Sequence, residues 1–236
     1  MDESRSDTQE NAASILQSDR AGGAHGIDLI GAWYAVGVTG HDQFRAFSLY
    51  ECRGGWDGGW RDVISLYKGV PDSMFLSSID DVRFQATSLP LVGAPGCPRS
   101  ENIAADRIRG DFALLEIADV RPGAALDYLA AVRAERAPVL ADHGHILAGL
   151  YEVAFTRTKA VSLWVTDLDG HVGVLRARDA ALGLDSEIPP DERLLEWDRR
   201  AAQFHTAPAR DLYLAAYPGP LLSPSGGQLR AESPAR

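Results

Sequence analysis

The sequence predicts an α+β protein composed of two similar units in tandem. The first observation is a repeated short stretch, AFSLYE from Ala46 and AVSLWV from Ala160. The second is the order of strand and helix patterns in the second half of the chain, which reads β-α-β-β-α-β. The third is a stretch rich in Pro and Gly, LPLVGAPGCPRS at 89–100, which separates two ordered blocks.

The residues around the repeated stretch also match. HGIDLIGAWYAVG and HGHILAGLYEVAF each place a glycine six residues after a histidine and an aromatic residue two positions further on. The sequence offset between the blocks is 118 at the His-Gly pairs and 114 at the AxSL stretches, so the turn of the first block is four residues longer. Repeats commonly diverge in loop length. A duplicated unit therefore explains the matches better than coincidence. The matched residues are His25, Gly31 and Trp33 in the first block and His143, Gly149 and Tyr151 in the second.

The second block provides the complete unit. Near-continuous apolar runs predict strands, and apolar positions at helical spacing predict helices. The long helix begins after Pro122-Gly123, has the apolar positions Ala125, Leu126, Leu129, Ala130 and Val132, and leaves open whether Pro138 kinks or breaks it. This order is the ferredoxin-like plan. The predicted strands are 112–120, 145–155, 160–168 and 211–217, and the predicted helices are 124–144, 171–182 and 189–204.

The first block repeats this plan without its opening strand. Strands are predicted at 26–37, 44–52 and 82–92, with a helix around Trp60 to Tyr67. We expect this unit to form three strands of its own and no fourth strand from residues 1–24. The expected domains are a polar segment 1–24, unit one at 25–92, a linker at 93–107, unit two at 108–219 and a disordered tail at 220–236.

Composition excludes several classes of function. The chain has 236 residues, a net charge of −10 and a pI near 5.0, which argues against nucleic acid or an anionic membrane as a partner. The two cysteines, Cys52 and Cys97, are expected as free thiols, and no Cys/His cluster indicates a metal site. The polar, acidic N-terminus is unlike a secretory signal, and no apolar stretch is long enough to span a bilayer. We expect a cytoplasmic protein.

The second block resembles the NIPSNAP family of the dimeric α+β barrel superfamily. The resemblance is carried by a strand with Glu, a Pro-Gly helix start, a Gly-aromatic strand and a Leu-Trp strand, at Glu116, Pro122, Gly123, Gly149, Leu163 and Trp164. The first block resembles the same pattern at Gly31, Trp33, Gly37, Leu49 and Tyr50. One departure is Ile117, where the family has Arg after the strand Glu. The resemblance implies that a single chain forms the two-sheet α+β barrel that relatives build by dimerising, with a ligand cavity between sheet and helices.

Three residues are the candidates for acid-base chemistry. Glu116 is a carboxylate within an apolar strand, on the same side as Phe112 and Leu114, and its burial is costly unless it is paired or protonated. His145 opens the next strand with the alternation of Leu147, Gly149 and Tyr151, and His205 precedes the last strand. The alternative interpretations are a solvent-facing carboxylate and histidines with structural roles.

Five aromatic residues are the candidates for binding substrate, with packing as the alternative role of each: Trp33, Tyr34, Tyr50, Tyr151 and Trp164. Trp56 and Trp60 lie four residues apart, so on a helix they share one face. This face is expected to pack on the sheet or, alternatively, to form a cavity wall for an aromatic substrate. No nucleotide-binding, metalloprotease or nucleophile-elbow motif occurs.

Two functions follow from these residues. The first is an enzyme, of oxygenase, isomerase or cyclase type, that needs no metal or organic cofactor and acts on an aromatic or polyketide-like metabolite of secondary metabolism. Its acid-base chemistry would take place in the sheet-helix cavity of the second unit. The second is a non-catalytic module of NIPSNAP type that binds a small molecule or a protein. A homodimer is compatible with either, and haem binding is a third, weaker option.

Overall fold

The computed structural model describes residues 26–36, 46–68, 89–216 and 220–224. These residues form an α+β protein whose chain divides into two compact units. Unit 1 comprises 1–33, 46–88 and 217–236, and unit 2 comprises 34–45 and 89–216. The second unit thus takes in the segment predicted as a linker.

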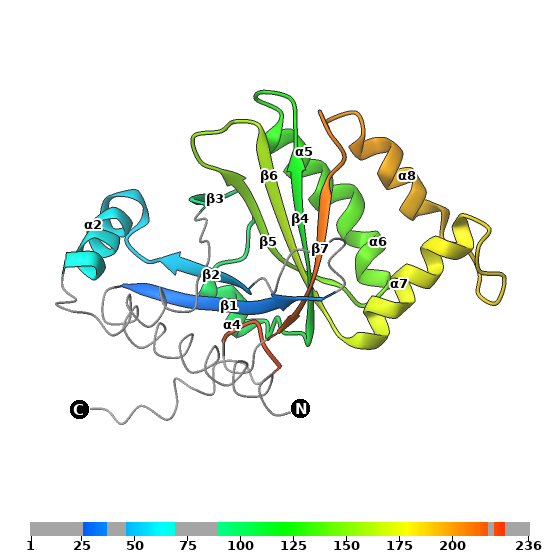
Figure 1. The fold of residues 1–236 in the computed structure, drawn as a ribbon, viewed down its shortest axis with the longest axis horizontal. Coiled ribbons are helices and arrows are strands. Elements are labelled where there is room, and N and C mark those ends of the chain that lie inside the picture. The colour runs from blue at the N-terminus through cyan, green and yellow to red at the C-terminus, as the bar shows by residue number, and fades with distance from the viewer. Residues whose placement is uncertain (1–25, 37–45, 69–88, 217–219, 225–236) are drawn as a thin grey trace, which may run out of the picture. The chain divides into compact units, whose positions relative to one another are not determined.

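The sheet of unit 2 contains five strands with antiparallel pairing (Figure 1). The order β7-β4-β6-β5 places the first and last strands of the predicted β-α-β-β-α-β series side by side, and β3 extends the sheet beyond β5. β3 falls within the stretch 82–92 that is predicted as the last strand of the first unit, but Leu91 pairs with Val153 of β5. The strands are β3 (Leu91–Gly93), β4 (Phe112–Asp119), β5 (Ile146–Val153), β6 (Lys159–Thr166) and β7 (Arg210–Ala216).

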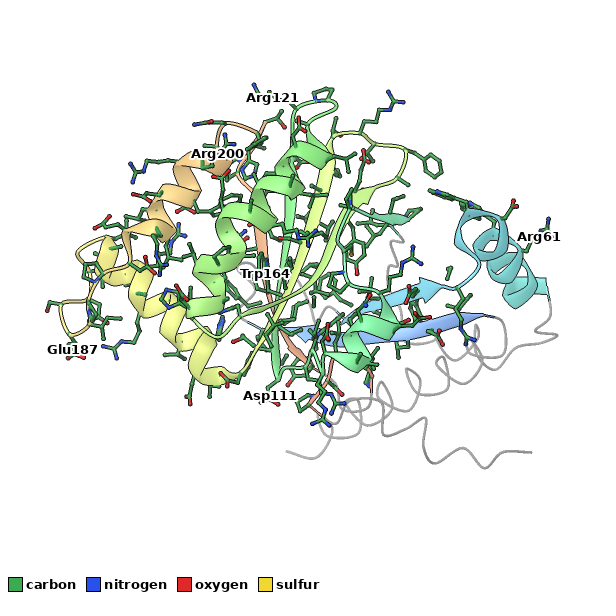
Figure 2. All side chains as sticks on the ribbon, turned by 180° about the vertical axis from the view of Figure 1, so that it is seen from behind. Arg61, Asp111, Arg121, Trp164, Glu187 and Arg200 are labelled. Atoms are coloured by element: carbon green, nitrogen blue, oxygen red, sulfur yellow. The ribbon has the colours of Figure 1, made fainter. Side chains whose placement is uncertain are left out.

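Helices cover one face of this sheet, as Figures 1 and 2 show from opposite sides. α5 (Ala125–Ala131) and α6 (Ala137–Asp142) connect β4 to β5, and α7 (Leu168–Ala181) and α8 (Glu192–Ala201) connect β6 to β7. A further short helix, α4 (Ser100–Ala105), lies in the segment that is predicted as a linker. The buried side chain of Ile103 ties α4 into the unit.

The long helix predicted at 124–144 contains a π-helical segment at Val132–Arg136, between α5 and α6. Pro138 has no N–H to donate to the residue four positions earlier, and its ring would clash with that carbonyl in a regular α-helix. A wider turn relieves both problems without breaking the helix. The π-helical segment ends on Arg136, whose side chain is buried.

The core of unit 2 lies between the sheet and these helices. Tyr128 and Leu129 of α5 pack against Leu114 and Trp164 of the sheet, and all four are buried. Of the predicted apolar positions, Ala125, Leu129 and Val132 are buried, whereas Leu126 is 49% exposed and Ala130 is also exposed. Tyr128 is an additional buried residue of this helix. Each fully buried side chain of this size contributes about 1.5–3 kcal/mol to folding.

A β-bulge in β5 changes which residues share a face. Leu147 lies opposite Trp164 and Gly149 opposite Leu163, so Ala148 is an extra residue between them. The predicted alternation from His145 through Leu147 to Gly149 and Tyr151 is therefore wrong. Leu147 packs against the helix-side core, whereas Gly149 and Tyr151 are on the opposite face of the sheet.

Unit 1 contains β1 (Ile27–Ala35) as far as Trp33, β2 (Ala46–Cys52) and α2 (Gly55–Lys68), in the predicted order. Backbone hydrogen bonds tie this unit together, since the N–H of Arg53 donates to the carbonyl of Gly26 and that of Leu222 donates to the carbonyl of Ile30. Residues 220–224 of the tail predicted to be disordered are therefore part of this unit, and residues 225–236 lie outside the described residues. Leu222 is fully buried, since the apolar pair Leu221-Leu222 has surface to bury.

The two units place a glycine under an aromatic ring in the same way. A Cβ atom on Gly31 would lie 1.9 Å from the Trp33 ring, and one on Gly149 would lie 2.3 Å from the Tyr151 ring. In each strand the ring therefore covers the glycine two residues before it. This local geometry explains the Gly-x-aromatic pattern that the two sequence blocks share.

The expected packing of Trp56 and Trp60 on the sheet is wrong, since they are 52% and 48% exposed. α2 approaches β2 through Gly59 instead, where a Cβ atom would lie 2.9 Å from the Cβ of Cys52. The predictions for residues 1–24, His25, Gly37 and 82–88 lie outside the described residues. None of the described helices combines the length and the apolar character needed to cross a bilayer.

Candidate functional site

Glu116 lies at the centre of the helix-side face of the sheet in unit 2. On β4 it is opposite Asp211 of β7 on one side and Ser162 of β6 on the other. Glu116 is 4% exposed, so the inward orientation expected for it is what the structure has.

Two side chains from the long helix donate hydrogen bonds to this carboxylate. The Tyr128 hydroxyl donates to Oε1, and Nη1 of Arg136 donates to Oε2 in a buried ion pair. The Ser162 hydroxyl lies 3.5 Å from Oε1 and accepts a hydrogen bond of 3.1 Å from Nε1 of Trp164. Glu116 is thus held by a phenol and a guanidinium.

Arg136 is fixed by its surroundings. Its guanidinium carbon lies 5.7 Å from the ring centroids of both Trp164 and Trp197. Burial alone would lower the pKa of Arg136, but the Glu116 and Asp211 carboxylates outweigh burial and raise it. Burial, with Glu116, also raises the pKa of Tyr128 well above its usual value. Tyr128 and Arg136 therefore remain protonated and donate hydrogen bonds to Glu116, whose carboxylate accepts both bonds.

The two candidate histidines occupy different parts of unit 2. The backbone of His205 forms an isolated antiparallel β-bridge with that of Val120. The His205 ring centroid lies 5.1 Å from that of Tyr128, beside the Glu116 network. His145 follows α6 and contacts the carbonyl of His143 through Nδ1 at 3.3 Å. Burial lowers the pKa of both rings, that of His145 to about 4. Among the described residues, Nε2 of each ring is buried without a hydrogen-bond partner.

The five aromatic candidates do not form one lining. Trp164 is fully buried within the Glu116 network and appears in Figure 2 between the helices and the sheet. Tyr151 is on the opposite face of that sheet. Trp33 is buried on β1 over Gly31, and Tyr50 on β2 is 38% exposed. Tyr34, at the end of β1, is half-buried.

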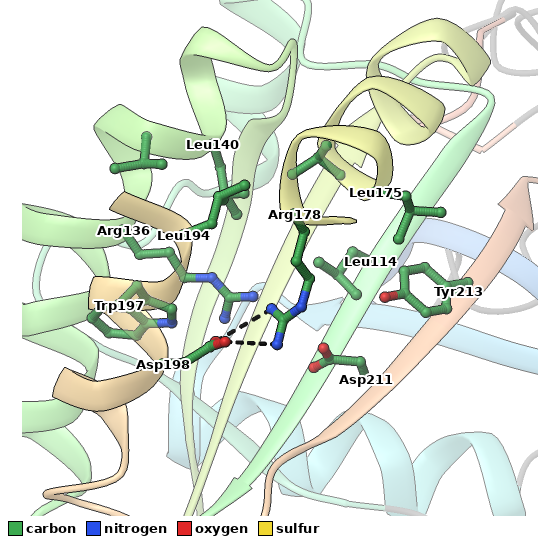
Figure 3. Close-up of a pocket in the computed structure, with 12 residues that line it drawn as sticks. Leu114, Arg136, Leu140, Leu175, Arg178, Leu194, Trp197, Asp198, Asp211 and Tyr213 are labelled. Carbon is green, nitrogen blue, oxygen red and sulfur yellow. Dashed lines mark hydrogen bonds and ion pairs between the residues drawn. The ribbon is translucent and has the colours of Figure 1, made fainter. Parts of the chain in front are cut away.

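A pocket of about 50 Å³ opens beside the Glu116 network, between α7, α8, the long helix and strands β4 and β7 (Figure 3). This volume holds a few water molecules or the head group of a small ligand. It is far below the range of roughly 300–1,000 Å³ typical of sites for drug-sized molecules. The lining includes the apolar side chains of Leu114, Leu140, Leu194 and Trp197 and the polar side chains of Arg136, Arg178, Asp198, Asp211 and Tyr213.

Asp211 is one of the ionisable residues of this pocket. The residue as a whole is exposed, but protein atoms crowd its carboxyl group, which faces the pocket in Figure 3. This desolvation, with the Glu116 carboxylate on the neighbouring strand, raises the pKa of Asp211 to about 6. Such a group exchanges protons readily near neutral pH.

Sequence reasoning identifies Glu116, His205 and Trp164 of this region but misses Tyr128, Arg136 and Asp211. Asp211 opens the predicted strand DLYLAAY with the alternation that places it beside Tyr213, and this alternation is a signal that could have found it. Arg136 carries no such signal, because the π-helical segment changes which positions of the helix face inward.

Within the described residues, no group of three or more His, Cys, Asp and Glu side chains is placed to hold a metal ion. Comparisons with models of protein families, with curated proteins and with solved structures found no match to this chain. The fold and the pocket are therefore the basis of any functional argument.

Proposed function

We propose that this protein acts on a small molecule in the pocket beneath α7 and α8, by acid-base chemistry with Asp211 as the proton-transfer group. The observation that carries this proposal is the Asp211 carboxyl, which faces the pocket and has a pKa of about 6. A base with a pKa near the working pH combines a large deprotonated fraction with useful basicity. The proposed reaction removes a proton from the bound molecule and returns it elsewhere, as in an isomerase or a cyclase.

This proposal assigns the base to Asp211 in place of Glu116. Glu116 is occupied by Tyr128 and Arg136, so abstraction of a proton by Glu116 would first have to break a buried ion pair. Asp211 has no such partner among the described residues, and Arg136 lines the same pocket beside it. The pocket volume favours a substrate, or a reacting portion of a substrate, smaller than an aromatic or polyketide-like metabolite.

We also propose that the chain is a tandem pair of ferredoxin-like units related to the NIPSNAP and dimeric α+β barrel proteins. The strand order of unit 2 and the shared Gly-aromatic geometry of β1 and β5 support it. The β1-β2-α2 and β5-β6-α7 series would then be the two copies of one element. The function rests on the pocket and does not require this relationship.

The second candidate is a non-catalytic module that binds a small molecule. The Glu116 carboxylate, which is paired with Tyr128 and Arg136, and the small pocket volume favour it, because a structural network and a small site are sufficient for binding. This candidate shares the pocket with the first and differs from it only in the absence of turnover.

Deuterium incorporation tests the proposed chemistry with simple model compounds. The protein is incubated in D₂O at about pH 7.5 with aminoacetone, hydroxyacetone and pyruvate, which are a cation, a neutral compound and an anion of similar size. Exchange at the carbon next to the carbonyl is followed by NMR. We expect protein-dependent exchange of at least one compound, lost in Asp211→Asn and retained in Asp179→Asn, an exposed carboxylate of α7 outside the pocket. Exchange that continues unchanged in Asp211→Asn would disprove the role of Asp211, and specific binding without exchange would favour the non-catalytic module.

A further inference from the structure

The charges of the pocket can be paired one by one. Arg136 forms its ion pair with Glu116, and Arg178 binds Asp198 through Nη2 and Oδ2 at 2.6 Å and through Nη1 and Oδ1 at 3.3 Å. Both guanidinium groups that line the pocket are therefore already matched to a carboxylate, as Figure 3 shows for Arg178.

Asp211 is the unmatched carboxylate. Among the described residues it accepts no side-chain hydrogen bond and forms no ion pair, although it lies opposite the Glu116 carboxylate across the β4-β7 pair. Like charges directly opposite each other on neighbouring strands are destabilising. Three carboxylates, Glu116, Asp198 and Asp211, thus surround two cations, and the pocket carries one excess negative charge.

The remaining surface of the pocket suits a positive group with a short apolar substituent. Leu114, Leu140, Leu194 and Trp197 offer apolar contacts beside Asp211. An anionic ligand would have to displace Asp198 from Arg178 or Glu116 from Arg136, and the second exchange would leave a buried charge unpaired.

We propose that the ligand of this pocket is a small organic cation, a protonated amine with a short apolar substituent, whose ammonium group pairs with Asp211. The inference rests on the proposed function for the location of the site and adds the charge and class of the molecule. A carboxylate has two oxygen atoms, so one can pair with the ammonium group while the other accepts a proton from the same molecule, and the adjacent cation lowers the pKa of Asp211 and so reduces its basicity in the complex.

A matched ligand series tests this inference in the full-length protein. Isobutylamine, isobutanol and isobutyrate have similar apolar parts and differ in charge. Binding is measured at about pH 7.5 by the chemical shifts of ¹³C-labelled leucine methyl groups, with Leu140 and Leu194 as reporters of the pocket. We expect isobutylamine to bind at least about tenfold more tightly than the other two, since a hydrogen bond to a charged group contributes about 1.5–3 kcal/mol.

Two variants with the same change in net charge complete the test. Asp211→Asn is expected to weaken binding of isobutylamine about tenfold or more, and Asp179→Asn is expected to leave it unchanged. If isobutanol or isobutyrate shifts the Leu140 and Leu194 signals and isobutylamine does not, the inference is overturned while the proposed site stands. If none of the three shifts these signals at millimolar concentration, the proposed site is overturned as well. Equal loss in both variants would show that only net charge matters and would also overturn the inference.

Discussion

At the residue scale, Glu116 and Asp211 are neighbouring carboxylates with different surroundings. Glu116 accepts hydrogen bonds from Tyr128 and Arg136 in the core, whereas Asp211 faces an open pocket and has no ion-pair partner among the described residues. The long helix thus supplies both donors to Glu116, and β7 supplies the unmatched carboxylate. Environment, and not residue type, separates the paired carboxylate of Glu116 from the unmatched carboxylate of Asp211.

Replacement of Arg136 tests the structural role of the network. Arg136→Met keeps the aliphatic stem but leaves Glu116 as a buried charge without its cation, so we expect a loss of about 3–5 kcal/mol in the free energy of unfolding. Urea denaturation measures the change, and Arg133→Met, in the same π-helical segment, is the control with little effect. Equal denaturation midpoints for the two variants would contradict the assigned role.

Replacement of Asp211 tests the electrostatics of the pocket. The pKa of about 6 lies above the value of an unfolded chain, which is about 4, so the folded protein binds more protons between these pH values. The carboxyl group therefore reduces stability as the pH rises through this window. We expect Asp211→Asn to raise Tm by about 2 °C at about pH 7.5 and to have no effect at about pH 4. Asp179→Asn is the control, and a Tm gain that persists in acid would contradict the electrostatic explanation.

At the element scale, two irregularities position the site residues. The π-helical segment Val132–Arg136 ends on Arg136, which donates to Glu116, and the bulge at Ala148 separates the face of Leu147 from that of Tyr151. Neither has a periodic signature in the sequence. The strands β4 to β7 and the helices that connect them are predicted at these places in the chain, because their apolar patterns extend over whole strands and helices. The inward position of Arg136 and the face of Tyr151 are not predicted. One extra residue in a strand moves every following side chain to the other face, and a wider turn in a helix rotates every following side chain around its axis.

Replacement of the glycine under an aromatic ring tests the packing of that ring on its strand. A Cβ atom at position 149 would lie 2.3 Å from the Tyr151 ring, so we expect Gly149→Ala to reduce the free energy of unfolding by about 1–3 kcal/mol. The double change Gly149→Ala with Tyr151→Ala removes this clash, so its loss should be smaller than the sum of the two single losses. Gly173→Ala in α7, where the added Cβ atom meets nothing within 4 Å, is the control and should be neutral or stabilising. Additive losses in the double variant would contradict the packing explanation.

At the scale of the whole molecule, histidines whose pKa is lowered by desolvation make stability depend on pH. Burial lowers the pKa of His145 to about 4 and also lowers those of His171 and His205. Each group binds a proton more readily in the unfolded chain, so acidification favours unfolding. The stabilising contribution of neutral His145 is complete above about pH 6.5 and is lost as the pH falls toward about 4.

We therefore expect the free energy of unfolding to decrease from about pH 7 to about pH 5, with a smaller decrease in His145→Gln. Urea denaturation at several pH values in this range measures both slopes. Equal slopes for the two proteins would show that His145 does not contribute to this pH dependence. No sequence pattern predicts this behaviour, because the burial of His145 depends on the packing of α6 against the sheet.

Asp211 is proposed as the reactive carboxylate of a pocket for a small cation. The most direct measurement is an NMR titration of the ¹³C-labelled Asp211 carboxyl carbon, assigned with Asp211→Asn, without and with isobutylamine. We predict a pKa of about 6 in the free protein and a lower pKa when the amine is bound, because an adjacent cation favours the ionised form. An ordinary pKa of about 4 that isobutylamine does not change would contradict the account.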